Sequence, residues 1–72
     1  MDSKLGILAG GGKLPGRLIK ICRESGRPYH VIAIEGQADS EVIGDSPHTW
    51  IRLGAAQKAL DVARQERFEE IV

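Results

Sequence analysis

Several short apolar runs along the chain, separated by glycine, proline and polar residues, have the pattern of β-strands. Residues Leu5–Ala9 and Tyr29–Ile34 are continuous apolar runs and predict two strands that are buried on both faces. Residues His48–Leu53 alternate instead, which predicts a strand with one less buried face at a sheet edge. Phe68–Val72 begins a further hydrophobic strand.

Two segments have the period of a helix. The first runs from Leu14 to Ser25, with Pro15 suited to its first turn and Gly26 and Pro28 suited to ending it. The second runs from Ala56 to Arg67. The apolar positions expected to point inward are Leu14, Leu18, Ile21 and Cys22 in the first helix, and Ala56, Ala59, Leu60 and Ala63 in the second.

The order of these segments predicts the fold. Residues from Glu35 to Pro47 are polar without a helical stripe and indicate a long loop. Strand, glycine turn, helix, strand, strand, helix, strand describes an α/β fold, a Rossmann-like parallel sheet with helices on both faces and right-handed crossovers. We expect the fourth strand beside the first. We also expect residues 1–72 to be an incomplete domain, truncated in that fourth strand.

Composition narrows the function classes. Ten Lys and Arg residues balance ten Asp and Glu residues, and there is one Trp, one Tyr and one Phe. Neither the charge nor the aromatic content suits a nucleic-acid binder. The apolar runs are far shorter than the about 20 residues that span a bilayer, and the first residues lack the long apolar stretch that is typical of a signal peptide. The single cysteine, Cys22, fits a reducing compartment such as the cytoplasm.

Three consecutive glycines, Gly10 to Gly12, stand between the first strand and the first helix. Such a turn gathers backbone N–H groups at the positive end of a helix, which favours phosphate binding. The dinucleotide fingerprint is matched at its first two glycines but has Pro15 at the third, while Glu35 stands near the acidic position that accepts from a ribose. Lys13 is a candidate phosphate ligand. Each candidate also has a purely structural interpretation. The glycines could only form a tight turn, Lys13 could be a solvated surface lysine, and Glu35 could face water.

Other candidate residues are weaker. His30 and Cys22 fall inside predicted elements and are expected to be structural. His48 stands at a loop-to-strand junction, which we expect on the side where ligands gather, and Trp50 is expected to pack at the sheet edge. Three acidic residues of the predicted loop could approach a metal ion, although solvated carboxylates are commoner: Asp39, Glu41 and Asp45.

Four sequence segments together resemble a known family. These are Leu5–Pro15, Ala33–Gly36, Pro47–Trp50 and Arg52–Gly54. The chain is similar over essentially its whole length to the N-terminal part of the LpxI family, the UDP-2,3-diacylglucosamine pyrophosphatases of lipid A biosynthesis. This combination is far more specific than a glycine motif alone.

The resemblance implies a hydrolase that uses water and Mg2+ to cleave UDP-2,3-diacylglucosamine to UMP and 2,3-diacylglucosamine 1-phosphate. It implies that the catalytic acids and the Mg2+ ligands belong to a C-terminal domain, so residues 1–72 form a substrate-binding domain with no catalytic or metal-binding residue. The residues implied to bind substrate are Gly10, Gly11, Gly12, Lys13, Glu35 and Gly36.

The resemblance also implies a cellular location and binding partners. The protein would be cytoplasmic, peripheral to the inner membrane through its nucleotide-linked glycolipid substrate, and a homodimer at full length, without nucleic acid. Two alternatives remain open from the residues themselves. One is an NAD- or FAD-type dinucleotide-binding domain of an oxidoreductase, favoured by Glu35 and weakened by Pro15. The other is a non-enzymatic nucleotide-sensing module.

Overall fold

Strands and helices alternate along residues 4–68 and 70–72, the part of the chain that the computed structural model describes. The elements are β1 (Leu5–Ala9), α1 (Leu14–Ser25), β2 (Tyr29–Ile34), α2 (Ser40–Ile43), β3 (His48–Ile51), α3 (Ala56–Glu66) and β4 (Glu70–Ile71). The predicted bounds of the first two strands and of the first helix are therefore confirmed.

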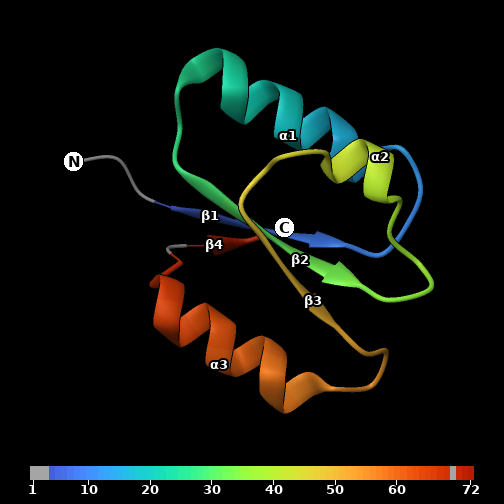
Figure 1. The fold of residues 1–72 in the computed structure, drawn as a ribbon. Helices are drawn as coiled ribbons and strands as arrows, with labels where there is room; N and C mark the ends of the chain where they lie inside the picture. Colours follow the sequence, from blue (N-terminus) through green and yellow to red (C-terminus); the bar gives the residue numbers. More distant parts are fainter. Residues whose placement is uncertain (1–3, 69) are drawn as a thin grey trace.

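The strands form one parallel sheet in the order β3-β2-β1-β4. Helices α1 and α2 cover one face and α3 covers the other (Figure 1). β4 pairs with β1 at Leu5 and Gly6, and β3 lies at the sheet edge. The predicted α/β fold is confirmed, including the place of the fourth strand beside the first.

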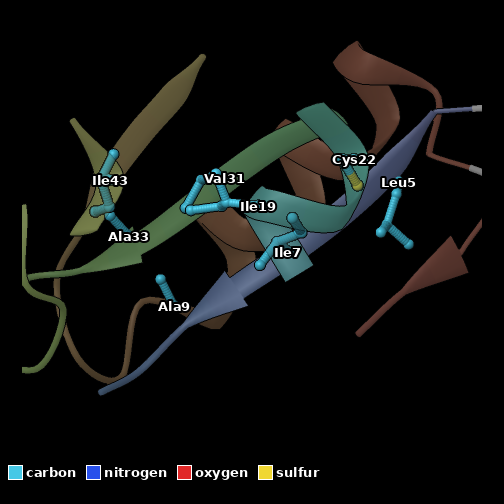
Figure 2. Packing of buried hydrophobic residues seen from close by; sticks show 8 residues of the cluster. All are labelled: Leu5, Ile7, Ala9, Ile19, Cys22, Val31, Ala33 and Ile43. Atoms are coloured by element: carbon cyan, nitrogen blue, oxygen red, sulfur yellow. The ribbon is translucent and has the colours of Figure 1, made fainter. Parts of the chain in front are cut away.

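Each face of the sheet has its own hydrophobic core, because side chains alternate across a strand. Val31 and Ala33 of β2 join the core beneath α1, whereas Ile32 joins the core beneath α3. Figure 2 shows the first core, made of Leu5, Ile7, Ala9, Ile19, Cys22, Val31, Ala33 and Ile43. The second core contains Ile32, Ile51 and Val62, with Ile34, Ala59 and Phe68 packed against it. Burying each such isoleucine contributes about 1.5–3 kcal/mol.

The buried face of α1 differs from the predicted one. Pro15, Ile19 and Cys22 are buried against the sheet, while Leu14 is 58% exposed and Ile21 60% exposed. The predicted inward positions Leu14 and Ile21 were wrong, because the apolar positions of this helix span a wider arc than the sheet covers. The buried Cys22 is confirmed as part of the core.

A short helix, α2, lies within the segment predicted to be a loop. The Asp39 carboxylate accepts a hydrogen bond from the Glu41 N–H at 2.9 Å and so caps the helix. The helix ends at Gly44, and Ile43 is buried in the first core. The loop prediction was wrong at this point because a single turn is too short to show a helical period.

Helix α3 also faces the sheet differently from the prediction. Val62 is buried and Leu60 is 51% exposed, so the inward prediction for Leu60 was wrong. Two positions along an α-helix are about 200° apart, so burying Val62 turns Leu60 outward. The Ala56 side chain, also predicted to face inward, lies outside what the structure describes.

Two strand predictions need smaller corrections. β3 ends at Ile51, two residues before the predicted end, and Leu53 lies in the following turn at 71% exposure. In β1, the expectation of burial on both faces was wrong at Leu8, which is 44% exposed. Leu8 borders a pocket that lies at the end of its strand.

Candidate functional site

The carboxyl ends of the parallel strands carry the predicted site residues. Gly10 to Lys13 follow β1, Glu35 to Ala38 follow β2, and Arg52 to Ala55 follow β3. The chain proceeds from β1 to β2 and β3 on one side and then returns to β4 on the other side of β1. The gap between the carboxyl ends of β1 and β4 is therefore a topological switch point, where ligands of open α/β sheets bind.

Two of the loop glycines have left-handed backbone conformations, Gly11 with φ 108° and Gly12 with φ 76°. A Cβ atom on Gly11 would lie 3.1 Å from the Gln37 carbonyl oxygen, so the missing side chain lets two loops pass closely. A Cβ atom on Gly12 would have no atom within 4 Å. The backbone at Gly12 is thus open to a ligand, and its conformation favours glycine for a reason unrelated to packing.

The amino end of α1 is electrostatically uncompensated. Lys13 is the N-cap residue, it makes no side-chain cap hydrogen bond, and the first helical turn contains no acidic residue. Pro15 in the first turn has no N–H to satisfy. The positive partial charge of a helix amino end attracts anions, and here Lys13 adds a full positive charge beside it.

A pocket of about 290 Å³ opens at the switch point. The N–H of Leu8 donates to the Val72 carbonyl at 2.9 Å, which holds Val72 beside β1. The lining residues come from β1, the glycine loop, α1 and the segment after β4: Leu8, Gly10, Gly11, Leu14, Pro15, Leu18 and Val72. No ionisable side chain is among them, so the pocket offers backbone groups at one end and apolar carbons elsewhere.

Glu35 and Gly36 lie in the turn on the other side of the glycine loop. The Gln37 and Ala38 N–H groups both donate to the Ile34 carbonyl, at 3.0 and 2.9 Å, and Gly36 takes φ 81°. The Glu35 carboxylate is 55% exposed and lies 3.9 Å from the Arg52 Nε. A pair so open to water is weak, and the carboxylate remains accessible to a hydroxyl donor.

The structure brings the predicted substrate-binding residues to one edge of the sheet. The contact between Gly11 and Gln37 joins the glycine loop to the turn that holds Glu35 and Gly36. Their predicted role in binding stays a prediction.

The two histidines lie at the opposite edge. His48 begins β3 and therefore stands at the amino ends of the strands, so its predicted place on the ligand side was wrong. The His48 Nδ1 is 2.6 Å from the Ser46 carbonyl oxygen. His30 is structural, as predicted, with its Nε2 2.9 Å from the Thr49 hydroxyl. Trp50 is partly buried against the first core, which confirms the packing prediction.

Two of the three acidic residues of the segment before β3, Asp39 and Asp45, have structural partners. Asp39 caps α2, and Asp45 lies 2.7 Å from the guanidinium of Arg23. Arg23 also donates to the Ser46 hydroxyl, which accepts a second hydrogen bond from the Tyr29 hydroxyl. Ser46 itself is buried. Within residues 4–68 and 70–72, no three His, Cys, Asp or Glu side chains are grouped so that they could hold a metal ion.

The sequence pattern missed the pocket. Leu14 and Leu18 have the helical spacing of core residues, and nothing in their period distinguishes a pocket wall from a core position. The only available sign was the width of the apolar arc of α1, which exceeds what one sheet contact can cover. Val72 enters the pocket through strand pairing, which a local pattern does not reveal.

Comparison with known proteins adds a family to this geometry. The model described as LpxI N-terminal domain matches residues 4–72. No curated protein matches the chain.

Proposed function

Because the chain belongs to the LpxI family, an enzyme family of lipid A synthesis, we propose that it is the substrate-binding part of a pyrophosphatase. The proposed substrate is UDP-2,3-diacylglucosamine. Hydrolysis of its pyrophosphate releases UMP and 2,3-diacylglucosamine 1-phosphate. This chain binds and orients the substrate.

The observation that supports this proposal best is the open backbone of the glycine loop at the switch point. Gly12 has free space above it and stands next to Lys13 and the uncompensated amino end of α1. A pyrophosphate placed there would receive backbone N–H groups, a helix dipole and an ammonium group together. These are the features that a doubly charged bridging group requires.

The turn after β2 offers a second contact for the nucleotide. Glu35 stands at the end of the strand next to the glycine loop, where Rossmann-type folds place the acidic residue that accepts from ribose hydroxyls. Its carboxylate is half exposed and only loosely paired with Arg52. We therefore assign the ribose of the uridine to Glu35 and the close backbone approach beside it to Gly36.

The described residues do not themselves fit a Mg2+ site, because no suitable group of side chains is present among them. In the proposal, Mg2+ and the catalytic acids belong to a C-terminal domain. When bound, Mg2+ would neutralise pyrophosphate charge and polarise the phosphorus under attack. The residues of this chain hold the substrate in place and take no part in proton transfer.

The nature of the substrate sets the proposed location. None of the described helices has the length and hydropathy needed to cross a membrane. A diacylated substrate resides in a bilayer, so we place the protein on the cytoplasmic side of the inner membrane, held there peripherally through its substrate. We propose a homodimer for the full-length protein.

Purified full-length protein with Mg2+ should release UMP from UDP-2,3-diacylglucosamine, and EDTA should abolish the release. The competing proposal is a dinucleotide-binding domain of an oxidoreductase, which the position of Glu35 after β2 also suits. Tight binding of NADH without any UMP release would favour that alternative and rule out the pyrophosphatase.

A further inference from the structure

The turns that follow β2 and β3, residues 34–37 and 52–55, have the same backbone construction. In each turn, the N–H of the last residue donates to the carbonyl of the first at 3.0 Å. The third residues, Gly36 and Gly54, have φ values of 81° and 90°, as a type II turn requires. A Cβ atom added to either glycine would meet no atom within 4 Å outside its chain neighbours. Both turns therefore leave open backbone surface.

These two turns continue the ligand edge of the sheet beyond the glycine loop. Because β1, β2 and β3 are parallel neighbours, the glycine loop, turn 34–37 and turn 52–55 follow one another along their carboxyl ends (Figure 1). The Glu35 N–H donates to the Ile51 carbonyl at 2.8 Å, which joins the second turn to the end of β3. β3 is at the sheet edge away from β4, so β1, β2 and β3 set this arrangement and β4 does not.

The side chains of turn 52–55 combine a positive charge with apolar surface. The Arg52 side chain is 90% exposed, and its Nε lies 3.9 Å from the Glu35 carboxylate, a weak contact in water. Leu53, the next residue, is 71% exposed. Nucleobases are recognised by apolar side chains against the ring face and by hydrogen bonds to the ring edge. Leu53 and Arg52 offer one group of each kind.

We propose that turn 52–55 binds the uracil base of the substrate. Leu53 lies against one ring face, Gly54 lets the ring approach the backbone, and the Arg52 guanidinium donates to the carbonyl oxygen at ring position 4. This inference rests on the proposed function, in which the pyrophosphate lies on the glycine loop and Glu35 accepts from the ribose. Phosphate, ribose and base follow one another in a nucleotide, as the three loops do along strands spaced about 4.8 Å apart.

Turn 52–55 suits a base better than a second phosphate. Arg52 alone would suit either ligand, but only a ring would remove the apolar surface of Leu53 from water. Donation from Arg52 to the base also costs little, because its contact with Glu35 is long and exposed. The Glu35 carboxylate is then free to accept from the ribose hydroxyls.

UMP and CMP test the ring edge on the full-length protein, because cytosine has an amino group where uracil has the carbonyl oxygen at position 4. Calorimetry should show tighter binding of UMP than of CMP. Arg52→Gln should raise the Kd of UMP by roughly tenfold, because a charged hydrogen bond is lost. The Kd of CMP should change little, since glutamine can accept from the amino group. Arg64→Gln, at an exposed arginine in the last turn of α3, should change neither Kd.

Leu53→Ser tests the ring face. It should raise the Kd of UMP by roughly fivefold, because apolar contact with the ring is lost. The affinity of ribose 5-phosphate, which has no base, is measured by competition with UMP and should stay unchanged. Leu60→Ser is the matched control, since Leu60 is 51% exposed but lies on α3, outside the turn. Equal weakening of both ligands in Leu53→Ser, or an equal effect of Leu60→Ser, would overturn the inference.

The base subsite and the pyrophosphatase can fail separately. A wild type that binds UMP and CMP equally, or a preference for UMP that survives Arg52→Gln, would reject the base subsite even in a protein that cleaves UDP-2,3-diacylglucosamine. The expected changes in Kd, found in a protein that never releases UMP from that substrate, would support the base subsite and reject the pyrophosphatase.

Discussion

The ring of Phe68 occupies the space in which a side chain on Gly6 would lie. A Cβ atom on Gly6 would stand 2.5 Å from the Phe68 Cδ2, closer than such atoms approach one another in proteins. Gly6 is in the central strand β1, and Phe68 packs against the second core, beside the partly buried His30. The missing side chain at Gly6 therefore allows the Phe68 ring to lie directly against β1.

Gly6→Ala should lower the free energy of unfolding by about 1–3 kcal/mol, because the extra methyl group forces the Phe68 ring and the backbone apart. Gly10→Ala is the matched control, since its Cβ atom would meet only the Ile34 Cδ1 at an ordinary 3.7 Å. Urea unfolding of the full-length variants measures both. Combining Gly6→Ala with Phe68→Leu should recover part of the loss. Equal stability of the two alanine variants would contradict this account of Gly6.

Gly12→Ala should weaken substrate binding more than it weakens the fold. Both Gly12 and Gly26 have left-handed backbones, with φ 76° and 72°, and an added Cβ atom at either would meet no atom within 4 Å. Each alanine substitution should therefore cost a similar about 1–2 kcal/mol of stability. Gly26 caps the opposite end of α1, far from the glycine loop.

Gly12→Ala and Gly26→Ala should differ in their affinity for the substrate. We expect Gly12→Ala to raise the Kd of UDP-2,3-diacylglucosamine by about tenfold or more, equivalent to about 1.4 kcal/mol, and Gly26→Ala to leave it unchanged. Calorimetry gives the Kd, and urea unfolding confirms that the two losses of stability match. Unchanged affinity in Gly12→Ala would remove the glycine loop from the substrate site.

His30 should make the stability of the fold sensitive to mild acid. Burial lowers the pKa of His30 below its ordinary value of 6.5, more than the Glu66 carboxylate at 3.7 Å raises it, and Lys4 and His48 lower it further. The folded state therefore binds a proton on His30 less readily than the unfolded state. Stability from neutral His30 is complete above about pH 6.5 and falls as the pH drops below that value.

Replacing His30 with glutamine should flatten this part of the pH profile. Glutamine retains a group that can bond to the Thr49 hydroxyl and does not titrate. Urea unfolding at a series of pH values between about 7.5 and 5.5 is the measurement. His48→Gln keeps His30 in place and serves as the control, in which this part of the pH dependence should remain. A wild-type profile retained in His30→Gln would exclude His30 as the source.

Glu66 affects stability at lower pH than His30 does, so the two contributions can be distinguished. A hydrogen bond from the Lys4 ammonium at 2.8 Å lowers the pKa of the Glu66 carboxyl below 4.5, more than burial raises it. Its contribution is present above about pH 4.5 and is lost as the pH falls through the lower pKa of the folded state. His30 and Glu66 thus lower the free energy of unfolding in successive pH ranges as the solution is acidified, His30 first and Glu66 at lower pH.

The sequence predicts those parts of the fold that depend on local chemistry. The end of α1 follows from Gly26, whose left-handed backbone lets its N–H bond to the Cys22 carbonyl. The first strands follow from uninterrupted apolar runs. The buried faces of α1 and α3 could not be predicted from the sequence as accurately. Leu14 and Leu60 fit the helical period as well as the residues that are buried against the sheet.

The site shows the same division. The glycine loop is visible in the sequence, because three consecutive glycines have no place inside a strand or helix. His48 was misplaced because a residue that begins a parallel strand lies at the amino edge, opposite the ligand edge. The pocket depends on Val72 meeting Leu8 through a long-range strand pair, which no local pattern contains.

Lys13 and Lys20 offer a direct test of which positive charges serve the substrate. Both lysines are exposed, but Lys13 is the N-cap residue of α1 beside Gly12, while Lys20 lies about two turns further along the helix. Lys20 already stands 3.9 Å from the Glu24 carboxylate. Only Lys13 is positioned to reach a pyrophosphate on the glycine loop.

Lys13→Ala should raise the Kd of UDP-2,3-diacylglucosamine roughly three- to tenfold at low salt, a loss of about 0.7–1.4 kcal/mol, and Lys20→Ala should not change it. The charge on Lys13 acts through solvent, where the screening length falls from about 10 Å at 0.1 M salt to about 3 Å at 1 M. The difference between wild type and Lys13→Ala should therefore shrink as salt is added, and Lys13→Arg should retain wild-type affinity. A loss that is independent of salt, or shared by Lys20→Ala, would show that Lys13 does not contact the phosphates.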